Sequence, residues 1–190
     1  MKFSVVGFVV LIPVFGFSQE SNNLSRDTIM PWLMSQKIEW KDFMGTLNPD
    51  VFAYALTSYK IDIIPDNVIV DSNDKIINYQ DLMVVANFYK KQSWSISKDT
   101  NLLNHERLHF DIAELYARKI RKRFSELKEI KEQRYSVYWN EYSKLWKACR
   151  VFQKQYDLET NHGAKQPEND KWISKVNVLL KSLDKFAIEI

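Results

Sequence analysis

Apolar residues alternate with polar ones in the first half of the chain and recur every three or four residues in the second half. The stretch 51–64 is rich in aromatic and β-branched residues, and its alternation at Tyr59, Ile61 and Ile63 is typical of a strand with one buried face. Short strands are also expected at 68–70, 82–89 and 93–96, although a helix over 81–86 is an alternative. The pattern predicts a small N-terminal sheet, mixed or antiparallel.

Three helices are expected after residue 98. Asp99 or Thr100 is placed to cap the first helix, which carries one apolar face formed by His105, His109, Ile112, Tyr116 and Ile120. A second helix starts near Gln133 and has apolar residues at 135, 138, 142, 145, 149, 152 and 156. The link over 128–132 is short, so these two helices should pack antiparallel. With a last helix starting at Pro167, we predict an α+β fold in which a long helical hairpin and a C-terminal helix follow the sheet.

The N-terminus is typical of a secretory signal peptide. Lys2 precedes an apolar run over 3–17, and small residues stand at Gly16 and Ser18. The run is shorter than the roughly 20 residues of a membrane helix, so a retained anchor is the less favoured alternative. We therefore expect a signal peptide over 1–18, a single domain over 19–190, and export to the periplasm or the medium without stable membrane insertion after cleavage.

The charge balance indicates no particular partner. The chain has 27 basic and 24 acidic residues, a formal net charge of +3. A basic run at 118–123 could contact an anionic partner such as nucleic acid, but acidic residues follow at 126, 129 and 132. A solvated helix face is therefore the favoured interpretation, and no nucleic-acid partner is expected. Cys149 is the single cysteine and lies on an apolar stripe, which excludes an internal disulfide and argues against a catalytic thiol.

The first predicted helix carries the pattern H-E-x-x-H at His105, Glu106 and His109. Histidines four apart lie about 40° apart around a helix, so both imidazoles can reach one Zn²⁺ ion, with Glu106 beside it as the catalytic base. Two buried histidines that only form hydrogen bonds are the alternative. Such a pair beside a carboxylate would leave several polar atoms in need of partners, and a metal satisfies them together.

The third ligand should come from the second helix. Counting 1.5 Å per residue along the hairpin places His109 level with Val151 and His105 level with Gln155, so the segment 156–162 reaches the metal end of the first helix. His162, the third histidine of the chain, is the first candidate for a zinc ligand, followed by Asp157 and then Glu159. Tyr156 and Tyr116 are candidates by position for stabilising an oxyanion.

Several of these motifs together resemble a known family. They are the segment Trp40-Lys41-Asp42-Phe43-x-Gly45, Ser93-Trp94, the segment from Leu102 to Glu114 with the H-E-x-x-H pattern, and Tyr156-Asp157-x-Glu159-Thr160-x-His162-Gly163 followed by Gln166 and Trp172. The chain is similar in these residues to the exported bacterial family called domain of unknown function nine-two-two, placed in the zincin-like clan of metallopeptidases. The resemblance implies a zincin-like fold and a zinc-dependent protease.

Two functions are compatible with these motifs. The favoured one is an exported zinc metallopeptidase whose partner is a peptide or protein substrate held along a strand edge, with 93–96 as the candidate strand. The alternative is a non-catalytic envelope binding protein with a structural zinc site. Hydrolysis of another amide, such as a cell-wall peptide bridge, would use the same chemistry.

Overall fold

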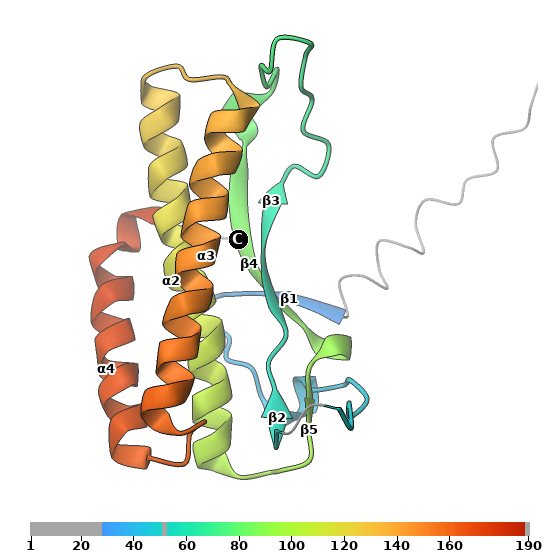
Figure 1. Ribbon diagram of the computed structural model, residues 1–190, viewed down its shortest axis with the longest axis vertical. Helices are drawn as coiled ribbons and strands as arrows, with labels where there is room; N and C mark the ends of the chain where they lie inside the picture. Colours follow the sequence, from blue (N-terminus) through green and yellow to red (C-terminus); the bar gives the residue numbers. More distant parts are fainter. Residues whose placement is uncertain (1–27, 51–52, 189–190) are drawn as a thin grey trace, which may run out of the picture.

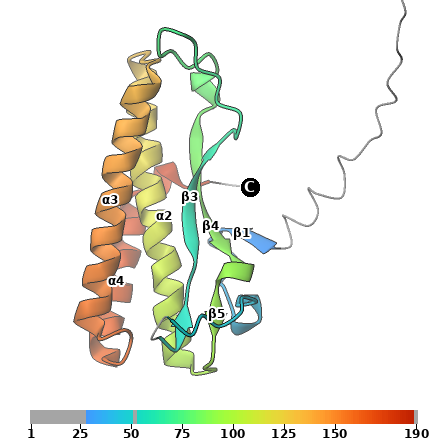
Figure 2. The same cartoon turned by 45° about the vertical axis from the view of Figure 1, so that its right-hand side comes forward.

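The computed structural model describes residues 28–50 and 53–188 of the chain. The helices form one layer and the strands lie on one side of it (Figures 1 and 2). The helices are α2 (Thr100–Glu129), α3 (Tyr135–Thr160) and α4 (Gln166–Ser182). The expected α+β fold is confirmed, with an antiparallel sheet, a helical hairpin and a C-terminal helix in that order. The predicted signal peptide lies outside the described residues.

Two small antiparallel sheets make up the strand layer. The larger one has the order β1-β4-β3, formed by β1 (Ile29–Pro31), β4 (Met83–Tyr89) and β3 (Tyr59–Ile64). The smaller one pairs β2 (Ala55–Leu56) with β5 (Trp94–Ser95). Short 3-10 helices lie at Trp40–Asp42 (η1), Tyr79–Asp81 (η2), Lys90–Gln92 (η3) and Asp184–Phe186 (η4).

Two strand predictions need correction. The strand expected over 51–64 is divided into β2 and β3, because the backbone N–H of Ser58 donates to the hydroxyl of Ser93 (2.9 Å) instead of continuing a ladder. The strand expected at 68–70 is a loop with a single bridge from Val70 to Ile76. The side chain of Asp71 accepts hydrogen bonds from two backbone N–H groups of that loop, which is a local alternative to strand pairing.

The core lies between β4 and α2. Val84, Ala86 and Phe88 of β4 are fully buried, as are Ile112 and Leu115 of α2. Complete burial of an aliphatic or aromatic side chain contributes about 1.5–3 kcal/mol, so this contact fixes α2 against the sheet. No helix in the described part of the chain combines the length and apolarity that a membrane crossing requires.

The sequence favoured a solvated helix face for the basic run at 118–123, but part of this run is buried. Arg118 is completely buried and Arg121 nearly so, and both donate to the buried carboxylate of Glu114. Glu114 and Arg118 are four residues apart, and Arg118 and Arg121 are three apart. This spacing places all three on one inward face of α2. Arg123 stays on the surface and pairs there with Glu126.

The helical hairpin brings three distant parts of the chain to one end of the molecule. Asp99 caps α2 by accepting from the backbone N–H of Leu102 (2.8 Å), and α3 ends at Asn161 in the left-handed conformation (φ 50°). The start of α2, the end of α3 and the β2–β5 pair all lie at the lower end in Figure 1. The H-E-x-x-H pattern is at this end.

Candidate metal centre

Three donor groups converge between α2 and α3. The Nε2 atoms of His105 and His109 are 3.1 Å apart. One carboxylate oxygen of Asp157, Oδ1, lies 3.3 Å from Nε2 of His105 and 3.0 Å from Nε2 of His109. All three donor atoms lie within 4.8 Å of one another, so this group could hold a metal ion.

Helix geometry accounts for the convergence. His105 and His109 are one turn apart on the buried face of α2, as the spacing predicts. On α3, Gln153 and Asp157 are also one turn apart and face the histidines. Antiparallel packing therefore opposes two pairs of residues, with Gln153 beside His109 and Asp157 between both imidazoles.

Gln153 fixes the proton position on His109. Its amide N–H donates to the backbone carbonyl of His109 (2.8 Å). Its amide oxygen therefore faces the Nδ1 atom of His109, at 2.5 Å. Nδ1 must then carry the proton, and the lone pair of the neutral imidazole is on Nε2, directed at His105 and Asp157. A lone pair aimed at a carboxylate oxygen is unfavourable unless a cation or proton lies between them, so the arrangement fits a metal ion.

His105 is held by packing. Its ring stacks on Tyr156 with a centroid distance of 4.5 Å, and the Tyr156 hydroxyl donates to the carboxamide oxygen of Asn169. The Nδ1 of His105 is buried and, among the described residues, has no hydrogen-bond partner. The opposite ring nitrogen, Nε2, faces the shared site, where it contacts Asp157 and His109.

The three groups perturb one another's protonation. Burial alone would raise the pKa of Asp157, but hydrogen bonds from His105 and His109 outweigh it and hold that pKa well below its usual range. Burial would lower the pKa of His109, yet the carboxylates of Asp157 and Glu106 raise it. Burial does lower the pKa of His105, and positive charge on His109 lowers it further. If the two imidazoles share one additional proton, that proton is therefore on His109 and His105 is neutral. Asp157 stays ionised.

A substitution at Gln153 should weaken metal binding. In Gln153→Met the tautomer of His109 is no longer fixed, and losing such an outer partner typically lowers metal affinity about 10- to 100-fold. Isothermal titration with zinc measures the change. The matched control is Gln155→Met, because Gln155 is exposed on the same helix and its amide N–H donates to Glu159, away from the histidines. Equal zinc affinity in both variants would contradict the assigned role.

The candidate metal centre opens into a cleft of about 930 Å³. Its wall includes His105, Glu106 and His109 from α2, strand β2, and the end of α3. Glu106 is almost fully buried, at 4% exposure, and its backbone carbonyl accepts a hydrogen bond from the Thr57 hydroxyl (3.3 Å). The expected catalytic base thus lies in the same cleft as the three donors.

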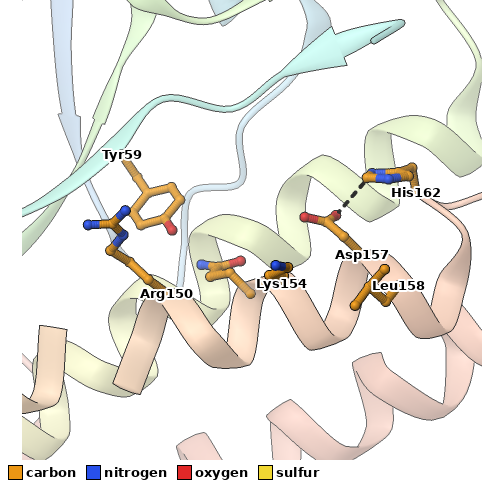
Figure 3. Close-up of a pocket in the computed structure, with 7 residues that line it drawn as sticks. Tyr59, Arg150, Lys154, Asp157, Leu158 and His162 are labelled. Carbon is orange, nitrogen blue, oxygen red and sulfur yellow. Dashed lines mark ion pairs between the residues drawn. The ribbon is translucent and has the colours of Figure 1, made fainter. Parts of the chain in front are cut away.

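His162 reaches this end of the molecule, as expected. Its side chain is 75% exposed, and its Nδ1 lies 3.7 Å from Oδ1 of Asp157 (Figure 3). It lines the cleft but is not one of the three converging donors. Its role as a zinc ligand stays a prediction. Asp157, the second candidate, is in the donor group, whereas Glu159 accepts from the indole N–H of Trp172 (2.7 Å).

Gly163 lets the loop after α3 approach His105 closely. It has a φ of 82°, and a Cβ atom there would lie 2.8–3.2 Å from ring and Cβ atoms of His105. A side chain at this position would therefore push against a donor residue.

The Gly163→Ala variant should be destabilised by roughly 1–3 kcal/mol, because it adds both the left-handed strain and the overlap with His105. Urea unfolding of the metal-free protein measures this. Ala164→Ser, at the exposed neighbouring position, should change stability by less than about 0.5 kcal/mol. A Gly163→Ala protein as stable as the control would show that the loop moves away freely.

Neither of the two tyrosines suggested for an oxyanion lines the cleft. Tyr156 stacks on His105, and its hydroxyl donates a hydrogen bond to Asn169. Tyr116 packs on Phe152 in a separate hollow. Tyr59 at the start of β3 lines the cleft instead, and burial raises the pKa of its hydroxyl, so it remains a proton donor. Neither Tyr59 nor Gln153 was predicted from the sequence. For Gln153 there was a signal, since it stands one turn before Asp157.

Comparison with known proteins bears on the segment that carries these residues. Residues 87–163 match the model of a family described as "Bacterial protein of unknown function (DUF922)". Searches of curated proteins and of solved structures found no match. The matched segment includes the end of β4, then β5, α2 and α3, hence all three candidate metal donors and Glu106. The resemblance to this family of bacterial proteins is thus confirmed over residues 87–163, the segment of the chain that carries the candidate metal centre.

Proposed function

We propose that this protein is an exported zinc metallopeptidase. The observation that carries the proposal is the convergence of His105, His109 and Asp157 in a cleft that also contains the buried Glu106. Two imidazoles and one carboxylate form a ligand set that zinc favours, and three protein ligands are typical of catalytic sites. The sequence resemblance to the zincin-like clan and the predicted signal peptide support the same function.

The residues of the cleft would have separate roles in peptide hydrolysis. Bound zinc would act as a Lewis acid and would promote ionisation of a water molecule at neutral pH. Glu106 would take the proton of the attacking water and pass it to the leaving amine. Tyr59, protonated and in the same cleft, would donate a hydrogen bond to the oxygen that becomes negative. The buried position of Glu106 keeps bulk water away from this proton transfer.

A free strand edge indicates how a peptide would lie. The backbone N–H of Ile96 donates to the carbonyl of Tyr54, so residues 54 and 56 form the hydrogen-bonded pairs with β5. The N–H and C=O groups of Ala55 then point away from β5, and within the described residues they have no backbone partner. Since Ala55 lines the cleft, an extended peptide could pair with β2. The strand that would receive the peptide is therefore β2. The segment 93–96, which the sequence suggested for this role, contains β5, the partner strand of β2.

One observation favours a second candidate function. His162 lies close enough to Asp157 to supply a fourth donor after a small side-chain movement. Four protein ligands would close the site, and a closed zinc site is structural. The protein would then be a non-catalytic binding protein of the cell envelope.

Zinc content and hydrolysis separate the two functions. Purified without chelator, the full chain should hold about one zinc per molecule and should cleave an unfolded protein such as casein. A chelator should abolish cleavage, and added zinc should restore it. Less than half a zinc per chain would contradict both functions. Full zinc occupancy that needs His162, with melting on chelation and no hydrolysis, would support the structural site. Asp157→Asn and His162→Ala, titrated with zinc in parallel, identify the third ligand.

Zinc affinity should depend on pH in a defined direction. The pKa of His109 is raised above its usual value near 6.5, and the metal binds only the unprotonated imidazole. The apparent Kd for zinc should therefore rise about tenfold per pH unit below that raised pKa, which is the slope for one competing proton. Competition titrations between about pH 8 and about pH 5.5 test this. A flat profile would contradict the raised pKa.

A further inference from the structure

A second hollow of about 390 Å³ adjoins the metal centre. It shares Tyr59, Gln153, Asp157 and His162 with the cleft, and its other wall is the outer face of α3. In Figure 3 the side chain of Arg150 rises from α3 toward the strand that carries Tyr59, and the Asp157 side chain rises from the same helix beside His162. A peptide lying in the cleft could thus continue past the metal centre into this hollow.

The hollow holds two cations that form no ion pair with any described residue. The described part of the chain has five other arginines, at 107, 118, 121, 123 and 134, and each forms a hydrogen bond through its guanidinium group. Arg150 alone among the described arginines forms neither a hydrogen bond nor an ion pair. Lys154, one turn further along α3, also has none. Because both are exposed, their positive charges are available to a ligand.

From the position of these two unpaired cations in the hollow we infer that the peptide substrate carries a carboxylate that binds to Arg150 and Lys154. This inference rests on the proposed peptidase function. Arginine and lysine together favour a small planar anion, because the guanidinium group can hold both carboxylate oxygens. Peptides supply carboxylates either as acidic side chains or as the C-terminus.

Helix geometry sets the distance between the carboxylate and the cleaved bond. Asp157 is seven residues from Arg150 and three from Lys154, which corresponds to about 10 Å and about 4.5 Å along α3. An extended peptide advances roughly 3.3 Å per residue. The carboxylate should therefore lie two or three residues from the peptide bond at the metal centre.

Matched peptides test this inference by binding alone. Fluorescent octapeptides with one Glu two or three positions to either side of the central bond are compared with the same peptides carrying Gln. A further pair, shortened so that the peptide ends three residues after the same bond, differs only in a free or amidated C-terminus. Binding to the zinc-loaded full chain with Glu106→Gln is measured by fluorescence polarisation. We expect the best Glu peptide, or the free-acid peptide, to bind about fivefold more tightly than its neutral partner, since two exposed cations contribute modestly.

Charge variants on the same helix identify the residues responsible. The double variant Arg150→Gln/Lys154→Gln should lose the fivefold preference. The matched control Lys144→Gln/Lys147→Gln removes two charges from α3 beside the separate hollow near Tyr116 and should keep it. A preference lost equally in both variants would indicate general charge attraction and would overturn the site.

The outcomes separate this inference from the proposed function. Equal binding of charged and neutral peptides by a protein that hydrolyses both would overturn the carboxylate site and leave the peptidase intact. A clear preference that depends on Arg150 and Lys154, in a protein that never hydrolyses peptides, would support an anion site and refute the peptidase. The Glu and free-acid arms decide between an acidic side chain and the C-terminus as the source of the carboxylate.

Discussion

The Glu106→Gln variant is expected to hydrolyse peptides roughly 100- to 10,000-fold more slowly than the wild-type protein while binding zinc equally well. Glutamine keeps the size of the side chain but cannot accept a proton from water. Glu106 is buried in the cleft and is not among the three converging donors, so its replacement should leave the ligands in place. The measurements are kcat/KM with a fluorogenic peptide and zinc content by mass spectrometry.

Glu126→Gln is the matched control for this experiment. Glu126 lies on the same helix but is exposed and pairs with Arg123 at the surface, far along α2 from the histidines. Its replacement should leave both hydrolysis and zinc content unchanged. If the Glu106 variant held zinc and still cleaved peptides at the wild-type rate, Glu106 could not be the base. If it lost zinc, the residue would instead support the ligands.

Much of the metal centre could be predicted because it depends on helix geometry. The spacing of His105 and His109 fixes their common face, and counting residues through the hairpin placed His109 level with Val151 and His105 level with Gln155. The observed neighbours are Gln153 for His109 and Tyr156 for His105, two residues and one residue further on. A regular helix has one rise per residue, so such estimates accumulate little error.

The choice between Asp157 and His162 could not be predicted in the same way. Asp157 is still helical and faces α2, whereas the chain leaves the helix at Asn161 and has a positive φ at His162 and Gly163. The direction of the His162 side chain depends on this turn and on the close approach of Gly163 to His105. Apolar spacing carries no information about a left-handed turn, so the ordering of the candidates rested on residue type alone.

A second large effect is expected at Glu114, away from the metal centre. Its Oε1 accepts hydrogen bonds from Nε of Arg118 (2.9 Å) and Nη2 of Arg121 (2.5 Å). The same arginines also bind the C-terminal segment, through the carbonyl of Leu180 (2.8 Å) and the carbonyl of Phe186 (2.6 Å). Arg118 also pairs with Asp184 of that segment (2.6 Å), so Glu114 is the buried anion that both arginines share where they connect α2 to the end of the chain.

The Glu114→Ala variant should lose about 3–5 kcal/mol of unfolding free energy, because it leaves the buried guanidinium group of Arg121 without a carboxylate and that of Arg118 with only the exposed carboxylate of Asp184. Urea unfolding followed by circular dichroism measures the loss. The control is Glu126→Ala, which breaks an exposed pair with Arg123 and should cost no more than about 1 kcal/mol. Glu114→Gln keeps an acceptor oxygen but no charge, so its stability should fall between those of the wild type and Glu114→Ala. A loss below about 1 kcal/mol in Glu114→Ala would mean that Arg118 and Arg121 reach water or other acceptors, and that the carboxylate is not what holds this contact.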